Sequence, residues 1–307
     1  HNEAAKQVMD TIHWTWLDPN AEEELQLGKG GYIVNNFCIN IQSNEPRCTS
    51  CHAGYGWKNK NFDFTAQNKV DCLVCHEQTG TYKKYPKGAG YPPKPPGQKF
   101  KGKFMPAPNY PKVAQSVARP TRKNCGTCHF YGGGGDGVKH GDLDSSLMKP
   151  RKSLDVHMGE NSQDFECVRC HTTVRHDIAG RIYMTPAYTE RKSLLEDDLG
   201  AKIQCEACHS AAPHKSGQKM NDHTDMVACQ SCHIPEFARV NPTKMWWDWS
   251  KAGKMKDGKP YKVKGPFGKQ TYNTKKGEFV WAKDVVPEYH WWNGTMVNDT
   301  ATTEIDP

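Results

Sequence analysis

Apolar residues are sparse along this chain and rarely follow the periodic patterns that mark regular elements. They make up 36% of the 307 residues, and the mean hydropathy of −0.83 is low for a packed aliphatic core of this length. Residues 3–9 are good helix formers, and Pro19 followed by Gly28 ends the helical pattern. No apolar run reaches the length of a bilayer-spanning helix, so no membrane span is predicted in this chain.

Three later segments have patterns of their own. Residues 270–272 and 278–281 flank Lys275-Lys276-Gly277, which predicts a short β-hairpin. The Pro/Lys-rich interval 83–112 predicts an extended surface excursion, with a docking surface for an acidic partner as the alternative. Residues 234–307 hold six of the nine tryptophans and are predicted to cap the rest of the molecule.

The cysteines give the strongest signal in the sequence. Twelve of the thirteen fall in six C-x-x-C-H motifs, the attachment signal for c-type haem. Disulfides or zinc sites are the competing explanation, but zinc ribbons do not require the following histidine. In chain order, the motifs consist of Cys48, Cys51 and His52; Cys72, Cys75 and His76; Cys125, Cys128 and His129; Cys167, Cys170 and His171; Cys205, Cys208 and His209; and Cys229, Cys232 and His233.

Covalent haem changes what the composition means. The two thiols of each motif form thioether bonds and the histidine becomes an axial iron ligand, so six haem c groups supply the missing apolar surface. Such attachment takes place outside the bacterial cytoplasm, which predicts a periplasmic or extracellular protein. The formal charge of +7 falls to about +1 when six oxidised haems with ionised propionates are counted. No arginine cluster is interleaved with aromatics, so no nucleic-acid partner is predicted.

Histidines outside the motifs are the candidate second iron ligands. Electron-transfer haems commonly have two axial histidines. The number of histidines outside the motifs is close to the number of haems that need a second ligand. His176 and His214 each lie five residues past a motif histidine, where a neighbouring haem would pass. A neutral lysine can also ligate iron, at a cost of roughly 4–5 kcal/mol at pH 7. The remaining histidines are His1, His13, His140, His157, His176, His214, His223 and His290.

Several runs of the sequence resemble the octahaem tetrathionate reductase family. They include Asn35-Asn36-Phe37-Cys38, residues 43–57 around the first motif, and Cys125-Gly126-Thr127-Cys128-His129-Phe130-Tyr131 with the glycine run that follows. Residues 227–235 and 243–250 extend the likeness to most of the chain. The resemblance implies a mainly α fold with much irregular structure, a closely packed haem chain and few short β-hairpins. Residues 1–233 would form this multihaem core, and the Trp-rich, haem-free residues 234–307 would pack on it.

The resemblance also bears on the ends of the chain. The family has eight haems, so His1 would be the histidine of a first motif and the eighth motif would follow Pro307. The sequence is then either a fragment or a homologue without two attachment sites, with up to eight haems in the full-length protein. Eight haems with one lysine ligand need seven distal histidines, which matches the seven that remain when His1 is set aside.

The resemblance implies that the haem on Cys48, Cys51 and His52 is the reactive one, with Lys139 as its second axial ligand. Asn35, Cys38 and Asp136 match family active-site positions, and Lys219 matches a further lysine through a looser alignment.

The function implied is reduction of tetrathionate to thiosulfate, with nitrite or hydroxylamine as other substrates of related proteins. Lys219 and Asn35 suit the sulfonate oxygens of this small inorganic substrate, and the Cys38 thiolate suits thiol exchange at its S–S bond. Asp136 can orient Lys139 or carry a proton. A redox donor protein or a quinol-linked cytochrome would supply electrons, and an oligomer is left open. The alternative is an electron-transfer conduit without substrate chemistry of its own.

Overall fold

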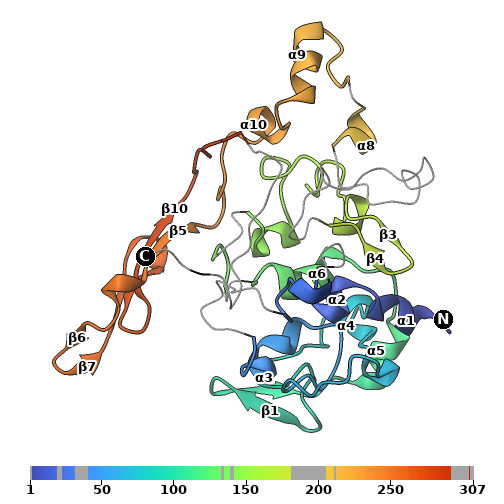
Figure 1. Ribbon diagram of the computed structural model, residues 1–307, viewed down its shortest axis with the longest axis vertical. Helices are drawn as coiled ribbons and strands as arrows, with labels where there is room; N and C mark the ends of the chain where they lie inside the picture. The colour runs from blue at the N-terminus through green and yellow to red at the C-terminus, as the bar shows by residue number, and fades with distance from the viewer. Residues whose placement is uncertain are drawn as a thin grey trace. The chain divides into compact units, whose positions relative to one another are not determined.

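The computed structural model describes residues 2–18, 23–31, 41–132, 135–138, 142–180, 205–210, 212–291 and 304. The chain forms two compact units, and Figure 1 labels most of their helices and several of their strands. The first unit consists of His1–Asn124, Glu166–Ala207 and Trp291–Pro307, and the second of Cys125–Phe165 and Cys208–His290. The predicted division into a haem-bearing core, residues 1–233, and a Trp-rich, haem-free segment, residues 234–307, stays a prediction.

Helices in the described part of the chain are short, and the longest, α6, has 8 residues. Glycine and proline, 47 of the 307 residues, recur too often in the sequence for longer ones. The helices are α1 (Ala4–Met9), α2 (Ile12–Thr15), α3 (Glu45–Cys48), α4 (Leu73–His76), α5 (Tyr110–Gln115), α6 (Arg122–His129), α8 (Glu206–His209), α9 (Gln218–Asp222) and α10 (Gln230–His233). No helix among the described residues is long and apolar enough to cross a membrane.

Most haem motifs lie on one of these short helical turns. Helix α3 ends at the first cysteine of its motif, and α4, α6, α8 and α10 each end at the motif histidine. One turn of helix brings both cysteines of a C-x-x-C pair to the same side as the histidine that follows, because residues three apart are neighbours on a helix.

The fourth motif departs from this arrangement. A 3₁₀ turn covers only Cys167–Arg169, and Cys170 directly follows it with its backbone N–H 3.2 Å from the Cys167 carbonyl oxygen. Cys170 is exposed, whereas Cys167 is half-buried. The N–H groups of Cys170 and His171 both bond to the Cys167 carbonyl and close the turn, and the predicted thioether bond of Cys170 would form at the protein surface.

The first unit contains two small hairpins. Strand β1 (Gly97–Phe100) pairs with β2 (Lys103–Pro106), and β3 (Thr173–Val174) pairs with β4 (Asp177–Ile178). The β1–β2 hairpin occupies part of the Pro/Lys-rich interval. Its lysines are exposed, as expected of a surface excursion.

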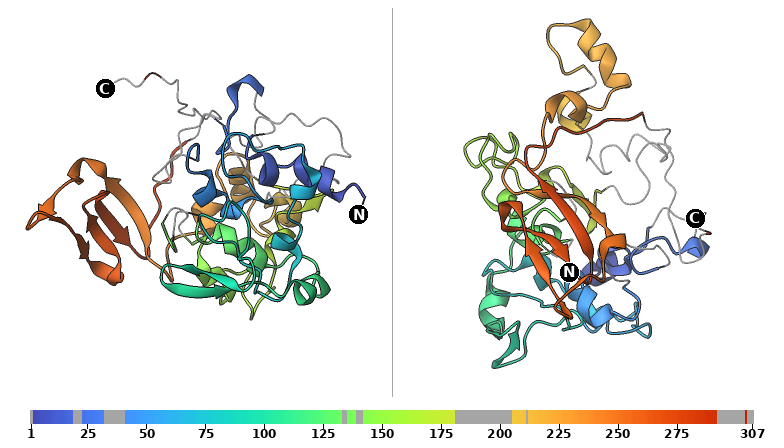
Figure 2. Two further views of the ribbon diagram at one scale, coloured as in Figure 1. Left: turned by 90° about the horizontal axis from the view of Figure 1, so that it is seen from below. Right: turned by 90° about the vertical axis from the view of Figure 1, so that its left-hand side faces the viewer.

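The second unit contains a four-stranded antiparallel sheet in the order β5-β10-β9-β8 (Figure 2). Its strands are β5 (Thr243–Asp248), β8 (Lys262–Lys264), β9 (Gln270–Asn273) and β10 (Gly277–Ala282), and a separate hairpin joins β6 (Met255–Lys256) to β7 (Lys259–Pro260). The predicted hairpin over 270–281 is confirmed as β9–β10. The sheet is larger than that hairpin because β5 and β8 pair with its two outer sides.

Aromatic rings and lysines pack against each other on this sheet. The Lys244 ammonium lies 3.9 Å from the Trp247 ring centre and 4.4 Å from that of Phe279, within cation–π range. Phe279 is buried against these two side chains. The short helices, few hairpins and extensive irregular structure therefore match the predicted fold class.

Candidate haem sites

Two motif histidines are oriented as axial ligands require. His76 Nδ1 lies 2.9 Å from the carbonyl oxygen of Ala118, and His171 Nδ1 lies 2.7 Å from that of Ala179. A hydrogen bond from Nδ1 to a carbonyl fixes the ring and leaves Nε2 with its lone pair for iron, as in other metal-bound histidines. The donor set and ring orientation at these two motifs therefore fit haem c.

The thiols of the same two motifs are accessible to a porphyrin. Cys72 and Cys170 are exposed, and Cys75 and Cys167 are half-buried. At the fourth motif, the exposed Cys170 directly precedes the oriented His171. A surface thiol beside a fixed imidazole is compatible with haem attachment, and the thioether bond at Cys170 stays a prediction.

Three pairs of histidine rings lie close together within single units, with angles of 74°, 65° and 11° between the ring planes. The ring centres are 6.4 Å apart for His76 and His176, 5.8 Å for His157 and His209, and 6.1 Å for His214 and His233. Two imidazoles bound to opposite sides of one metal at the usual distance of about 2.0 Å each would have ring centres roughly 6 Å apart. Each pair combines one motif histidine with one histidine outside the motifs, so all three fit bis-histidine ligation.

Polar side chains orient two of these non-motif histidines, and the sequence reasoning missed them. His176 Nδ1 lies 2.9 Å from Gln7 Oε1. Asn221 holds His214 at three points: its Oδ1 accepts from the His214 backbone N–H at 2.9 Å and lies 3.2 Å from Nδ1, and its Nδ2 donates to the His214 carbonyl at 3.0 Å. Gln7 and Asn221 carry no sequence signal of this role, because neither belongs to a motif.

The first motif has a different arrangement. His52 is 0% exposed, and its Nε2 lies 2.7 Å from the carbonyl oxygen of Trp14. Its Nδ1 is buried and has no hydrogen-bond partner among the described residues. The nitrogen that would face iron at the other motifs is here bonded to a carbonyl oxygen, so haem ligation by Nε2 requires that hydrogen bond to be given up.

Aromatic side chains enclose the His52 ring. The rings of Trp14 and Trp57 have their centres 5.0 Å from that of His52, and Trp16, Phe62 and Phe64 lie within 6.3 Å. This burial lowers the pKa of His52 to about 4, against the opposing effect of its hydrogen bond to Trp14. His52 is therefore neutral at physiological pH. Among the residues that the structure describes, no second histidine ring faces it.

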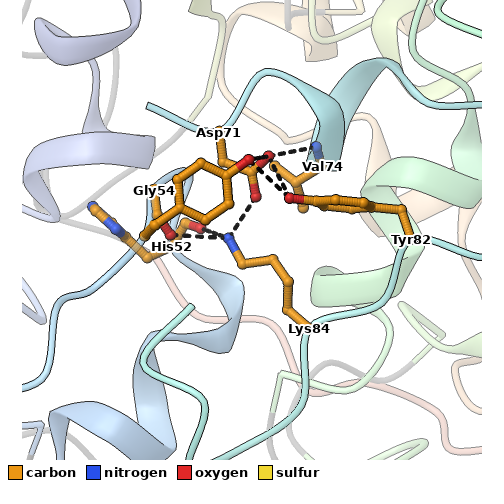
Figure 3. Close-up of polar contacts among 7 residues, drawn as sticks. His52, Gly54, Asp71, Val74, Tyr82 and Lys84 are labelled. Carbon is orange, nitrogen blue, oxygen red and sulfur yellow. Dashed lines mark hydrogen bonds and ion pairs between the residues drawn. The ribbon is translucent and has the colours of Figure 1, made fainter. Parts of the chain in front are cut away.

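A buried polar network ties the first motif to the second (Figure 3). Lys84 Nζ donates to the carbonyl oxygens of His52 at 2.6 Å and Gly54 at 3.1 Å, and forms an ion pair with Asp71 Oδ2 at 2.9 Å. Both charged side chains are at most 2% exposed. Lys84 therefore joins the residue that ends the first motif to the one that precedes Cys72.

The other oxygen of Asp71 completes this network. Asp71 Oδ1 accepts hydrogen bonds from the hydroxyls of Tyr55 at 2.9 Å and Tyr82 at 3.0 Å, and from the Val74 N–H at 3.2 Å. Val74 lies inside the second motif. The fully satisfied carboxylate thus fixes the turn that carries Cys72 and Cys75. Asp71 and Lys84 give no sequence signal of this pairing, because 13 positions separate them.

Lys29 is a further cation beside the first motif that sequence reasoning missed. Burial lowers its pKa, and the nearby thiols of Cys51 and Cys48 oppose this effect. Burial is also the main cause that raises the pKa of the Cys48 thiol. A partly desolvated lysine close to the attachment thiols distinguishes the first motif.

Of the predicted catalytic residues, the structure describes Asp136 and Lys219. The Asp136 carboxylate accepts from the Ser145 N–H at 2.9 Å and from the Ser145 hydroxyl at 2.8 Å. Lys219 is exposed on α9, two positions before Asn221. Both belong to the second unit. Asn35, Cys38, Lys139, His140 and His1 lie outside the described residues.

The glycine run beside Asp136 is anchored to the first strand of the sheet. The Gly137 carbonyl accepts from the Thr243 hydroxyl at 2.9 Å and from the Lys244 N–H at 2.8 Å. Gly137 has φ +67°, and a Cβ there would collide with the Pro242 carbonyl oxygen. The loop therefore approaches the protein backbone closely at this glycine.

The remaining predicted ligands have varied surroundings. His129, His223 and His290 are exposed. His13 lies in α2, where burial lowers its pKa against the opposing charge of Asp177, and its carbonyl accepts from the Ala53 N–H at 3.2 Å. Ala53 follows the first motif directly, so α2 lies against that motif.

Comparisons with known proteins agree with this geometry. The chain is similar to an octahaem cytochrome c from Shewanella oneidensis whose crystal structure is known, with 47% identity and a TM-score of 0.80 over all of this chain and 63% of that one. Residues 244–307 match the model of a family described as bacterial cytochrome c. An uncharacterised protein of Archaeoglobus fulgidus is 28% identical over 137 residues, 42% of this chain and 45% of that protein. The chain thus spans less than two thirds of the length of either relative.

These likenesses, the six motifs and the paired histidines define the class. The chain is a multihaem c-type cytochrome that carries covalently bound haem c. More particularly, it is similar over its whole length to an octahaem cytochrome c, which confirms the predicted kind of protein.

Proposed function

We propose that this chain is part of a periplasmic or extracellular multihaem reductase that reduces tetrathionate to thiosulfate at the first motif. The observation that carries the proposal is the contrast between His52 and the paired histidines. Three motif histidines lie close to a second histidine ring at a spacing that fits one shared iron, whereas His52 lies in an aromatic enclosure with no histidine facing it among the described residues. Pairing alone does not separate the first motif from those of His129 and His171, so the aromatic enclosure and the buried Lys84–Asp71 pair are what single it out. A haem without a second histidine is suited to a lysine ligand and a substrate.

The chain's own residues would bind and position the substrate. Tetrathionate is a dianion, and Lys219 and Asn35 would donate to its sulfonate oxygens. Reduction adds two electrons, breaks the central S–S bond and releases two thiosulfate ions. Haem c, when bound, supplies the electrons. Cys38 would lie beside the bond that breaks, where its thiolate would attack one central sulfur and release the first thiosulfate. The two electrons would then reduce the resulting mixed disulfide, which releases the second thiosulfate and restores the Cys38 thiolate.

Asp136 would position Lys139 through the loop that carries both. Both oxygens of its carboxylate are occupied by Ser145, which favours a holding role over proton transfer. Gly137 fixes the same loop to Thr243. A firmly held loop is what a lysine ligand needs, because holding its amine neutral at pH 7 costs about 4–5 kcal/mol.

The test is an assay of reduced-dye oxidation by the full-length holoprotein with tetrathionate, nitrite or hydroxylamine. Cys38→Ala and Lys139→His are compared with wild type, and Lys149→His serves as a control at an exposed lysine of the second unit. Tetrathionate turnover should fall at least tenfold in the first two variants and stay unchanged in the control.

Other outcomes decide against parts of the proposal. If nitrite or hydroxylamine reacts and tetrathionate does not, the site is retained and the substrate is wrong. If no substrate reacts and no added ligand changes the haem spectrum, the chain is an electron conduit, the alternative that the paired histidines alone would favour.

A further inference from the structure

The hairpin β6–β7 and the strand β8 form a strongly basic, exposed part of the second unit. Residues 254–264 contain five lysines and one aspartate, a net charge of +4. Ten of these eleven residues are exposed, the exception being the half-buried Tyr261. Lys254 pairs with Glu278 at 3.3 Å, whereas Lys256, Lys259, Lys262 and Lys264 form no ion pair with any residue that the structure describes. Most of this charge is therefore uncompensated within the described chain.

An exposed apolar face accompanies these lysines. The register pairs Val263 with Tyr272, Tyr272 with Glu278, and Val280 with Trp246, so these side chains lie on one face of the sheet, with the buried Tyr272 between the exposed apolar ones. Val263 is 43% exposed, Val280 38% and Trp246 51%. Large exposed apolar side chains together with uncompensated charge are typical of a protein interface, because an ordinary solvated surface needs no such apolar centre.

The sheet is also joined to the last haem motif of the same unit. The Tyr289 hydroxyl, beyond β10, donates to the Gln230 carbonyl at 3.0 Å, and Gln230 begins the helix α10 that carries Cys232 and His233. A backbone bridge between Phe237 and Val285 makes a second connection. A protein bound to the sheet would therefore sit on an element attached directly to a haem-bearing helix.

We infer that this edge of the sheet with its hairpin, which carries Lys256, Lys259, Lys262 and Lys264 beside the exposed apolar residues Val263, Val280 and Trp246, is the docking surface for an acidic electron-transfer protein. The partner's carboxylates would meet the lysines, which raises the encounter rate by electrostatic steering. One electron would pass from the reduced partner to the cytochrome in each encounter, with no bond formed or broken. The inference rests only on the electron-transfer part of the proposed function, not on the identity of the substrate.

The chain supplies a matched control. In the first unit, Lys99, Lys101 and Lys103 of the β1–β2 hairpin and Lys94 just before it also give a net charge of +4 over residues 94–103, and all four lysines are exposed. Exposed apolar side chains are fewer there: within the hairpin, only Phe104 is a large exposed one, at 58%. If net charge alone sets the rate at which the acidic partner binds, charge reversal in either region should lower that rate equally. If docking requires the sheet, only charge reversal beside the sheet should lower it.

The experiment uses the full-length holoprotein and reduced flavodoxin as an acidic one-electron donor. The second-order rate of haem reduction is measured against ionic strength for wild type, for the sheet variant Lys256→Glu/Lys259→Glu/Lys262→Glu/Lys264→Glu, and for the hairpin variant Lys94→Glu/Lys99→Glu/Lys101→Glu/Lys103→Glu. At low ionic strength the sheet variant should be at least tenfold slower, within the range that steering supplies. The hairpin variant should lose less than threefold. Reduction by a small uncharged dye should be equal in all three.

Several results would overturn the inference. Equal losses in both variants would mean that net charge suffices, and a larger loss in the hairpin variant would place docking in the Pro/Lys-rich interval. The holoprotein without a partner can also be acetylated and analysed by mass spectrometry. If the four sheet lysines react poorly, the protein's own chain covers them and they are not available to a partner. Loss of binding to vesicles of anionic phosphatidylglycerol, with an unchanged flavodoxin rate, would indicate a membrane surface. None of these outcomes depends on whether tetrathionate is turned over.

Discussion

The first haem motif and the three paired motifs differ in how the protein holds their histidines. At the paired motifs, hydrogen bonds to Nδ1 of His76, His176 and His214 orient imidazoles whose rings lie close together. At the first motif, aromatic rings and a buried ion pair enclose a histidine that is neutral and already bonded through Nε2. Hydrogen bonds hold the histidines of the paired sites in place, whereas aromatic rings at the first site exclude water from the His52 side chain.

The largest effect is expected from removing a paired histidine. His214→Ala should leave the haem of His233 with one strong axial ligand, converting one low-spin haem to a high-spin one. Electron paramagnetic resonance of the oxidised holoprotein measures the change. An unaltered spectrum would show that these paired rings do not share an iron.

The next effect concerns the enclosure of the first motif. Lys84→Met leaves the buried Asp71 carboxylate without its counter-charge, which should lower the free energy of unfolding by about 3–5 kcal/mol. Denaturant unfolding of the holoprotein measures it. The double variant Lys84→Met/Asp71→Asn should recover part of the loss because no charge stays buried. If the double variant is no better than Lys84→Met, the ion pair is not the source of the stability.

A smaller effect is expected from loosening one paired ligand. Asn221→Ala removes the group that orients His214, and such changes typically cost roughly 10–100-fold in metal affinity. Displacement of His214 by added cyanide should become about tenfold faster, as followed by absorption spectroscopy. Gln218→Ala on the same helix, whose side chain bonds Asp222 instead, should leave the rate unchanged.

The smallest effect is a pH dependence of the enclosure. Burial, followed by the Asp71 carboxylate, raises the pKa of the Tyr82 hydroxyl. The unfolded chain loses this proton near pH 10 while the folded protein keeps it, so stability should fall above about pH 10, by up to about 1.4 kcal/mol per pH unit for this group. Urea unfolding at pH 9 and pH 11 should show a weaker decline in Tyr82→Phe. An identical decline in both proteins would mean that Tyr82 titrates normally.

The sequence predicted those features that depend on residues close together in the chain. The C-x-x-C-H spacing predicts the haem class, and the hairpin over 270–281 follows from its turn residues and is confirmed. The pairing of His76 and His176 could not be predicted, because these residues are 100 positions apart and no periodicity relates them. Their proximity depends on how irregular segments pack, and no propensity encodes such packing.

The same spacing does not fix the local structure of every motif. Identical C-x-x-C-H patterns give a helix that ends at His76 in α4, but only a short 3₁₀ turn capped by Cys170 at the fourth motif. The intervening residues differ, and the strands β3 and β4 follow the fourth motif at once. The motif therefore predicts the chemistry of its cysteines and not the backbone that carries them.

A similar limit applies to the first motif. Burial of His52 among Trp14, Trp57 and Phe62 joins rings from separate segments, and none of these residues stands at a periodic position. The resemblance assigned a reactive role to this motif, whereas the enclosure and the Lys84–Asp71 pair were visible only in the structure. The catalytic roles of Cys38 and Lys139 stay predictions.

The length of the motif helices has a consequence for how the protein is made. Helices α3, α4, α8 and α10 have 4 residues each, far below the roughly 12–15 residues at which an isolated helix becomes marginally stable in water. Such turns have little structure until a bulky group covers them, so the attachment enzymes would meet an extended chain with accessible thiols. Maturation would then proceed in one order, with haem ligation first and chain compaction after it, and each attached porphyrin would nucleate the turn that holds it.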